Sequence, residues 1–334
     1  DREINSPGEP GISYHMGTGF TSTDIPASAQ AFLDNMRSTS AERNQAMVKR
    51  VNEFLSPLVL DYDFDVLPLT PNGNATERHL CLAYARKAAS MFPEESDLRT
   101  FWSEKLGVAQ EDIKELPEGR PITDLIRAKT MKQGGVGYVK PDSGSFPKMA
   151  EMNEFSLLCG AIPTFTWLDG CSNGEQSIEE LVEVGRSTGV AAFNIIPDRD
   201  YTPGQKDQKL ENLNQVVKLT QDLGLPLLGG TEMNSPGQKF VDDFSSAELA
   251  PHHNLFLRGS WILHAHSTLQ RYAGMGYLSD WAENQFSGVE SKNDFYASFG
   301  ESFSPRGDRI LQDSLNAEMG AGEVSELAVR AMSA

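Results

Sequence analysis

The fold is decided by the segment AIPTFTWLDG, residues 161–170, an apolar run that ends in an aspartate and a glycine. Such a run followed by Asp-Gly is typical of a buried strand that leads into a turn. Further apolar runs alternate with helical patterns at spacings of about 25 to 36 residues, which are typical of βα units in a parallel sheet. The expected strands are 136–139, 161–168, 190–196, 225–228 and 261–264. The expected helices are 149–159, 177–188, 207–223 and, less regularly, 236–249.

These units predict an α/β fold, a (β/α) barrel of the TIM type, regular or distorted, with an N-terminal helical elaboration. We expect one barrel domain over residues 1–334, with 1–57 as a helical lead and 96–134 as a helical insert. Another strand is expected in PLVLDYDFDVLPLTP, residues 57–71. The alternative is an open doubly wound sheet, but its glycine fingerprint after a first strand is not found.

The composition narrows the classes of partner. The 334 residues include 47 acidic and 29 basic side chains, a net charge of −18 that repels phosphate backbones and anionic lipids. No apolar run approaches the roughly 20 residues needed to cross a bilayer. We expect a small-molecule substrate, no nucleic acid and no membrane, and leave a homo-oligomer open. Three cysteines without paired spacing favour a reducing, cytoplasmic compartment, although the start without Met leaves a processed or truncated chain open.

Polar residues follow the expected strands, at the edge where parallel α/β folds place their active sites. Asp169, Asp198 and Glu232 are the candidate catalytic carboxylates. The candidate substrate-binding residues are Asn194, Arg199 and Asn234 at strand ends, with Arg78 and His79 at the start of an upstream helix. An arginine or a helix start can bind a substrate anion.

The segment WILHAHST, residues 261–268, places two histidines one residue apart. In a strand, residues i and i+2 face the same side, so His264 and His266 would enter one cavity. With Glu232 they would form a site for a divalent metal, Zn, Mn or Fe. Alternatively the strand ends at His264, and His266 caps a helix or hydrogen-bonds within a wall.

Each candidate also has an ordinary structural interpretation. Asp169 precedes a glycine, which is a common turn position. Glu232 could be an acid at a helix start, where the helix dipole favours it. Arg199 lies between two aspartates, as in a self-neutralising surface cluster. These alternatives stay open on the sequence alone.

The segments GAIPTFTWLDG, NIIPD and LLGGTEMNSPGQ resemble the later part of the PHP-type metallohydrolases, which are related in architecture to the amidohydrolase barrels. The resemblance covers about residues 136–270 and depends on GGTEMNSPG, where that family has Gly-Ser/Thr-Asp-x-His. It implies a distorted barrel, a cluster of divalent ions and phosphoester hydrolysis by a metal-bound hydroxide. The family's opening H-x-H is not found near this N-terminus, and Glu232 and Asn234 stand where it has Asp-x-His.

The resulting hypothesis is a metal-dependent hydrolase, a phosphoesterase or an amidohydrolase-like enzyme, that acts on a small anionic substrate through a metal-activated water. One alternative is a sugar or sugar-acid isomerase or lyase on a barrel. The other is a barrel that binds a small molecule without catalysis.

Overall fold

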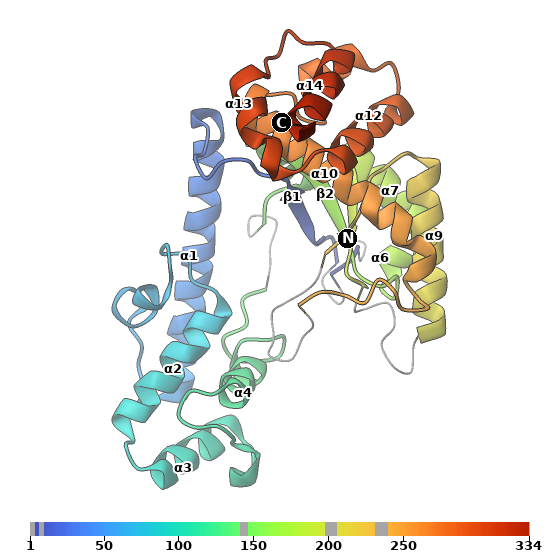
Figure 1. Cartoon of the computed structure of the whole chain (residues 1–334). Coiled ribbons are helices and arrows are strands. Elements are labelled where there is room, and N and C mark those ends of the chain that lie inside the picture. Colours follow the sequence, from blue (N-terminus) through green and yellow to red (C-terminus); the bar gives the residue numbers. More distant parts are fainter. Residues whose placement is uncertain (1–3, 7–9, 141–145, 198–205, 231–239, 334) are drawn as a thin grey trace. The chain divides into compact units, whose positions relative to one another are not determined.

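The computed structural model describes residues 4–6, 10–140, 146–197, 206–230 and 240–333 (Figure 1). These residues group into two compact units. Unit 1 is formed by Asp1–Ala29 with Lys148–Ala334, and unit 2 is formed by Gln30–Pro147. In the described residues, every helix is too short or too polar to cross a lipid bilayer.

Unit 1 contains a four-stranded open sheet in the order β1-β2-β3-β4. Its strands are β1 (His15–Thr18), β2 (Ile162–Trp167), β3 (Ala192–Ile195) and β4 (Leu227–Gly229). Strands β2, β3 and β4 are parallel, whereas β1 is antiparallel to β2 and pairs Thr18 with Ile162. Every residue of β2 and β3 is buried, as expected for strands covered on both faces.

The predicted closed barrel is wrong, because the described sheet has four strands and two free edges. Regular βα spacing is shared by open sheets and barrels, so the repeat did not reveal whether the sheet closes. The predicted strands at 161–168, 190–196 and 225–228 are confirmed as β2, β3 and β4. The first strand of the sheet, β1, was not expected.

Helices of unit 1 pack against this sheet, and further helices pack against one another beside it (Figure 1). Side chains of helices 178–187 and 206–222 form a core with Phe165, Trp167 and Phe193 of the sheet. A second core, around Leu269, Tyr296 and Leu327, joins helices 253–273, 289–302 and 321–333. The helices of unit 1 are α5 (Met149–Leu158), α6 (Asn173–Gln176), α7 (Ile178–Ser187), α9 (Lys206–Asp222), α10 (His253–Ala273), α11 (Asp280–Gln285), α12 (Val289–Ser302), α13 (Asp308–Ser314) and α14 (Ala321–Ser333).

Helix α10 corrects the predicted strand at 261–264. Its buried residues Phe256, Ile262, Ala265 and Leu269 recur at helical intervals along one face. Gly274 ends the helix in the left-handed conformation, with φ 67°. The apolar residues Trp261, Ile262 and Leu263 are therefore part of a 21-residue helix.

The strands predicted at 136–139 and within 57–71 are also wrong. The helix predicted at 236–249 is absent from the described part of that range. Residues 136–139 complete a glycine-rich turn, in which the Gly137 N–H donates to the Thr130 carbonyl oxygen at 2.7 Å. Within 57–71, Asp61 accepts hydrogen bonds from two backbone N–H groups and starts a π-helical turn, Tyr62–Val66. Residues 240–249 form turns, and the rest of the helix predicted at 236–249 lies outside the described residues.

Unit 2 is helical in its described part and has its own core around Met47, Tyr84, Trp102 and Ile122. Its long first helix falls within residues 1–57, and two further helices fall at 95–106 and 120–130; the division into a lead, a barrel and an insert stays a prediction. Its helices are α1 (Ala27–Leu55), α2 (Glu77–Met91), α3 (Glu95–Leu106) and α4 (Arg120–Thr130).

Candidate functional site

The carboxyl edge of the parallel strands carries a buried ion pair. Asp169 lies two residues after the end of β2, and its Oδ2 lies 2.9 Å from Nζ of Lys209 in the first turn of α9. The two side chains are 17% and 7% exposed, respectively, so most of the pair is removed from water. The other carboxylate oxygen of Asp169 accepts the backbone N–H of Cys171 at 3.1 Å. The charge pair lies at the edge of the parallel sheet where α/β folds place their catalytic groups.

Glu175 holds the loop that presents Asp169. Its two carboxylate oxygens accept the backbone N–H groups of Leu168, at 2.8 Å, and Gly170, at 3.0 Å. Burial raises the pKa of Glu175 to about 7, and the backbone N–H donors oppose that shift. Since both oxygens are used on the backbone, Glu175 fixes the position of Asp169.

Two further polar groups complete the turn. The Asn212 side-chain amide of α9 donates to the Asp169 carbonyl oxygen at 3.0 Å. Ser172 caps the short helix α6 by accepting the Glu175 N–H at 3.2 Å, and its hydroxyl donates to the Ile4 carbonyl oxygen at 2.7 Å. Gly170 has φ +72°, and a Cβ there would approach Asn212 to 2.6 Å. The turn is therefore closed tightly around the aspartate.

Neither Lys209 nor Glu175 was singled out from the sequence, although each belongs to a recognisable sequence pattern. Lys209 lies in register with the buried Leu213, Val216 and Thr220, so it is a lysine on the apolar face of its helix. Ser172 and Glu175 follow the Ser-x-x-Glu pattern of a capping box, in which the glutamate reaches back to the backbone.

Of the other residues predicted at strand ends, the structure describes one. Asn194 lies nearby in the sheet, buried in β3. Asp198, Arg199, Glu232 and Asn234 lie outside the described residues, and their roles stay predictions.

Arg78 and His79 belong to unit 2, at the start of α2. Arg78 pairs with Asp124, and His79 Nδ1 accepts the Thr76 N–H at 3.0 Å, so both have local partners. Glu77 beside them pairs with Arg127 at 2.7 Å. Their role in binding a substrate anion stays a prediction.

The two histidines of the H-x-H segment do not face one cavity. On a helix, residues i and i+2 point in nearly opposite directions. His264 stacks on Phe303 at 6.3 Å between ring centroids. His266 faces the other way: a Cβ built on Gly19 would lie 2.6 Å from its ring.

His266 is also separated from Asp169 along β2. It lines a cavity with Gly160 and Ala161, just before β2, whereas Asp169 follows the other end of that strand. Six strand residues span roughly 20 Å. In the described residues no group of three or more His, Cys, Asp or Glu side chains is arranged to hold a metal ion.

The comparisons with known proteins leave the family of this chain undefined. The sequence matches no protein-family model and no curated protein. Among solved structures, it is similar to that of an amidohydrolase from Chromobacterium violaceum with bound sulfate and no metal, at 14% sequence identity and a TM-score of 0.42. The match covers 72% of this chain and 69% of that chain. Because this likeness is too distant to carry a functional argument, function is argued from the site, and the PHP-type resemblance stays a prediction.

Proposed function

We propose that this chain is a hydrolase that acts on a small anionic substrate at the carboxyl edge of β2, β3 and β4. The observation that supports it is the buried Asp169–Lys209 ion pair, with its 2.9 Å separation, at the end of a parallel strand. A carboxylate and an ammonium with little access to water interact more strongly with a reacting molecule than exposed charges do.

Each charged group has a role that follows from its contacts. Asp169 would act as a general base: it would accept a proton from the attacking water and pass it to the leaving group as the bond between that group and the substrate breaks. Lys209 would bind the substrate anion and balance the negative charge that develops during attack. Glu175 would be a positioning residue, since it contacts the backbone of the Asp169 loop.

The described part of the site does not have the donor set of a divalent metal. Asp169 supplies one carboxylate, and its oxygens already accept from Lys209 and from Cys171 N–H. Three ligands from N, O or S atoms are typical of catalytic zinc sites. We therefore assign no step to a metal: His264 and His266 face opposite sides of α10, and Glu232 lies outside the described residues.

The test is hydrolysis of three chromogenic probes: p-nitrophenyl phosphate, p-nitrophenyl hydrogen succinate and N-succinyl p-nitroanilide. At least one should be cleaved, and Asp169→Asn should lower kcat/KM by about 100-fold or more. Lys206→Met is the matched control, because Lys206 is on the same helix but pairs with Glu248 at the surface, and it should keep kcat/KM within about twofold.

Two outcomes would reject this proposal. One is the absence of cleavage of all three probes by the folded protein. The other is exchange of a sugar-acid C–H proton with deuterated solvent without hydrolysis, which would favour the isomerase or lyase class. Circular dichroism of Asp169→Asn separates a catalytic loss from unfolding.

A further inference from the structure

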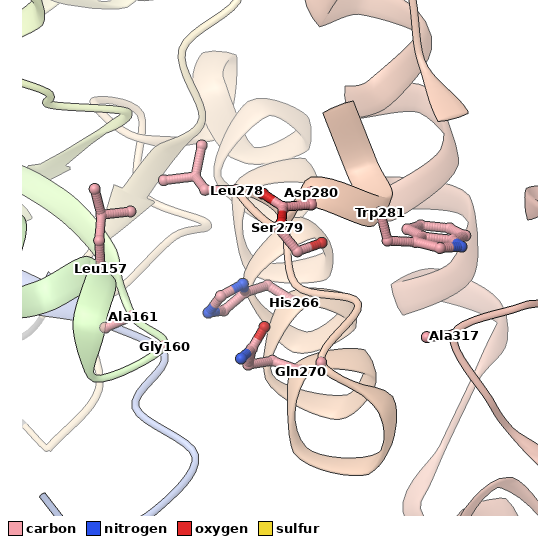
Figure 2. Close-up of a pocket in the computed structure, with 11 residues that line it drawn as sticks. Leu157, Gly160, Ala161, His266, Gln270, Leu278, Ser279, Asp280, Trp281 and Ala317 are labelled. Carbon is pink, nitrogen blue, oxygen red and sulfur yellow. The ribbon is translucent and has the colours of Figure 1, made fainter. Parts of the chain in front are cut away.

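A cavity of about 430 Å³ lies at the amino end of β2, away from the proposed hydrolytic site. It is bordered by the turn between α5 and β2, by α10 and by the start of α11 (Figure 2). Leu157, Ala161, Leu278 and Trp281 give it apolar walls. Two side chains of α10, His266 and Gln270, project toward Gly160 and Ala161 in Figure 2.

Two consecutive backbone N–H groups fix the orientation of these side chains. Tyr277 N–H donates to Nδ1 of His266, and Gly276 N–H donates to Oε1 of Gln270, each at 3.0 Å. The acceptor atom of each side chain is thereby used. A neutral imidazole with Nδ1 as acceptor carries its proton on Nε2, and the Gln270 amide keeps its NH₂ group as a donor. The residues are four positions apart, so both donors lie on one face of α10.

The His266 donor is buried, and no described residue forms a hydrogen bond of normal geometry with it. The residue is 2% exposed, and its Nε2 makes no hydrogen bond to any described residue. Burial lowers the pKa of His266 to about 4, against a smaller opposing effect of the Gly160 and Gly19 carbonyl groups, so the ring is neutral at physiological pH. A buried donor without an acceptor is costly, and a ligand oxygen would remove that cost.

Glycines allow the backbone to approach these two side chains closely. A Cβ on Gly276 would lie 2.4 Å from Oε1 of Gln270, and one on Gly19 would lie 2.6 Å from Cδ2 of His266. Larger residues would displace the donors. The donor pair is therefore held in place before any ligand binds, which lowers the entropy lost on binding.

The charges around the cavity define the ligand further. Asp280, at the first position of α11, is the one charged residue among the described lining residues, since His266 is neutral. A cavity with an acid and no cation disfavours an anion, in a chain of net charge −18. A neutral amide matches the polar groups, because its carbonyl oxygen has two lone pairs and its N–H can donate to a carboxylate.

We infer that this cavity binds a small neutral molecule with an amide-type group, whose carbonyl oxygen accepts from His266 Nε2–H and the Gln270 amide and whose N–H donates to Asp280. This inference is independent of the proposed hydrolase, because it concerns the opposite end of β2. Apolar walls would hold the rest of the ligand, as in most small-molecule sites.

Three probes of similar shape test the ligand class: nicotinamide, nicotinate and 3-methylpyridine. Titration calorimetry and ¹H–¹⁵N spectra of the intact protein should show nicotinamide binding with a dissociation constant on the order of 1 mM. The other two should bind at least about tenfold more weakly, because nicotinate is charged and 3-methylpyridine lacks the carbonyl. The Nε2–H signal of His266 should move when nicotinamide is added.

Gln270→Glu is the decisive variant. It keeps an oxygen for the Gly276 N–H, removes the NH₂ donor and adds a negative charge, so it should weaken nicotinamide binding about tenfold or more. Gln285→Glu is the matched control, because Gln285 accepts the Ala321 N–H at 3.1 Å away from the cavity lining. It should bind nicotinamide as the unchanged protein does.

Three results would overturn the inference. They are no binding of nicotinamide by the unchanged protein, equal binding of nicotinamide and 3-methylpyridine, and equal binding by Gln270→Glu and Gln285→Glu. Thermal unfolding of the two variants shows whether a loss of binding comes from a loss of structure.

Discussion

The two ends of β2 carry polar groups of opposite kinds. At the carboxyl end, Asp169 and Lys209 form a charge pair, and the oxygens of Glu175 both accept backbone N–H groups. At the amino end, His266 and Gln270 use their acceptors on the backbone and keep their donors. The first end has paired its charges within the protein, whereas the second has a buried donor with which no described residue forms a hydrogen bond of normal geometry. Burial therefore has different consequences at the two ends: it strengthens a charge pair at one and keeps an imidazole neutral at the other.

The largest expected effect comes from breaking the charge pair. Lys209→Met leaves the mostly buried Asp169 carboxylate without its cation, and unfolding free energy should fall by about 3 kcal/mol. The double variant Asp169→Leu/Lys209→Met removes both charges and should recover part of this loss. Urea unfolding at pH 7 measures the unfolding free energy of the unchanged protein, the single variant and the double variant.

Lys206→Met is the control for that experiment, since it removes a partly exposed lysine from the same helix and should cost at most about 1 kcal/mol. Equal small losses in Lys206→Met and Lys209→Met would show that the Asp169–Lys209 pair behaves as a surface pair. The carboxyl end of β2 would then no longer differ from the amino end by a stabilising buried charge pair.

Glu175 gives the carboxyl end a pH dependence. Its pKa is raised from 4.5 to about 7, so the folded chain binds a proton in this interval that the unfolded chain has lost. The stabilisation is complete below about pH 4.5 and is lost as pH rises through 7, a change of about 3 kcal/mol. The stability difference between the unchanged protein and Glu175→Gln should therefore shrink from pH 5 to pH 8 in urea titrations.

Glu179→Gln, an exposed change in the next helix, is the comparison for this titration. If the difference between the unchanged protein and Glu175→Gln is the same at pH 5 and pH 8, Glu175 does not titrate in this interval. Its role would then be limited to the two backbone hydrogen bonds.

The parts of this fold that the sequence predicted are those determined by local patterns. Strand β2 and the amphipathic α7 follow from runs of apolar residues and helical spacing, which report burial directly. The barrel was wrong because closure depends on how many strands pair, and no local pattern reports that number. The strand predicted at 261–264 was wrong because a short apolar run shows no periodicity of its own. The residues that define the helix, such as Phe256 and Leu269, lie outside that run.

The candidate site was predictable to a similar extent. Asp169 could be found because an acid directly after a buried strand lies at the edge where parallel sheets place polar groups. Lys209 could not be paired with it from sequence, because the two residues are 40 positions apart and meet through the packing of α9 on the sheet. His264 and His266 were grouped as ligands on strand geometry, and the helix separates them.

His266 gives the amino end the opposite pH dependence, with the smallest expected effect. Its pKa is lowered from 6.5 to about 4, so the unfolded chain binds a proton in this interval that the folded chain does not. The stabilisation is complete above pH 6.5 and is lost as pH falls toward 4. Between pH 6.5 and pH 5 the loss should be about 2 kcal/mol. His266→Gln removes the titrating group, so its stability difference from the unchanged protein should vary by this amount across the interval.

His264→Gln is the matched control for this measurement, because it changes a histidine two residues away on the opposite side of α10. A slope in His266→Gln and none in His264→Gln would place the neutral donor on the cavity side of the helix. The same slope in both variants would contradict that assignment, since the effect would then come from the helix as a whole. Opposite slopes for Glu175 and His266 in one protein would show directly that the two ends of β2 respond to protons in opposite senses.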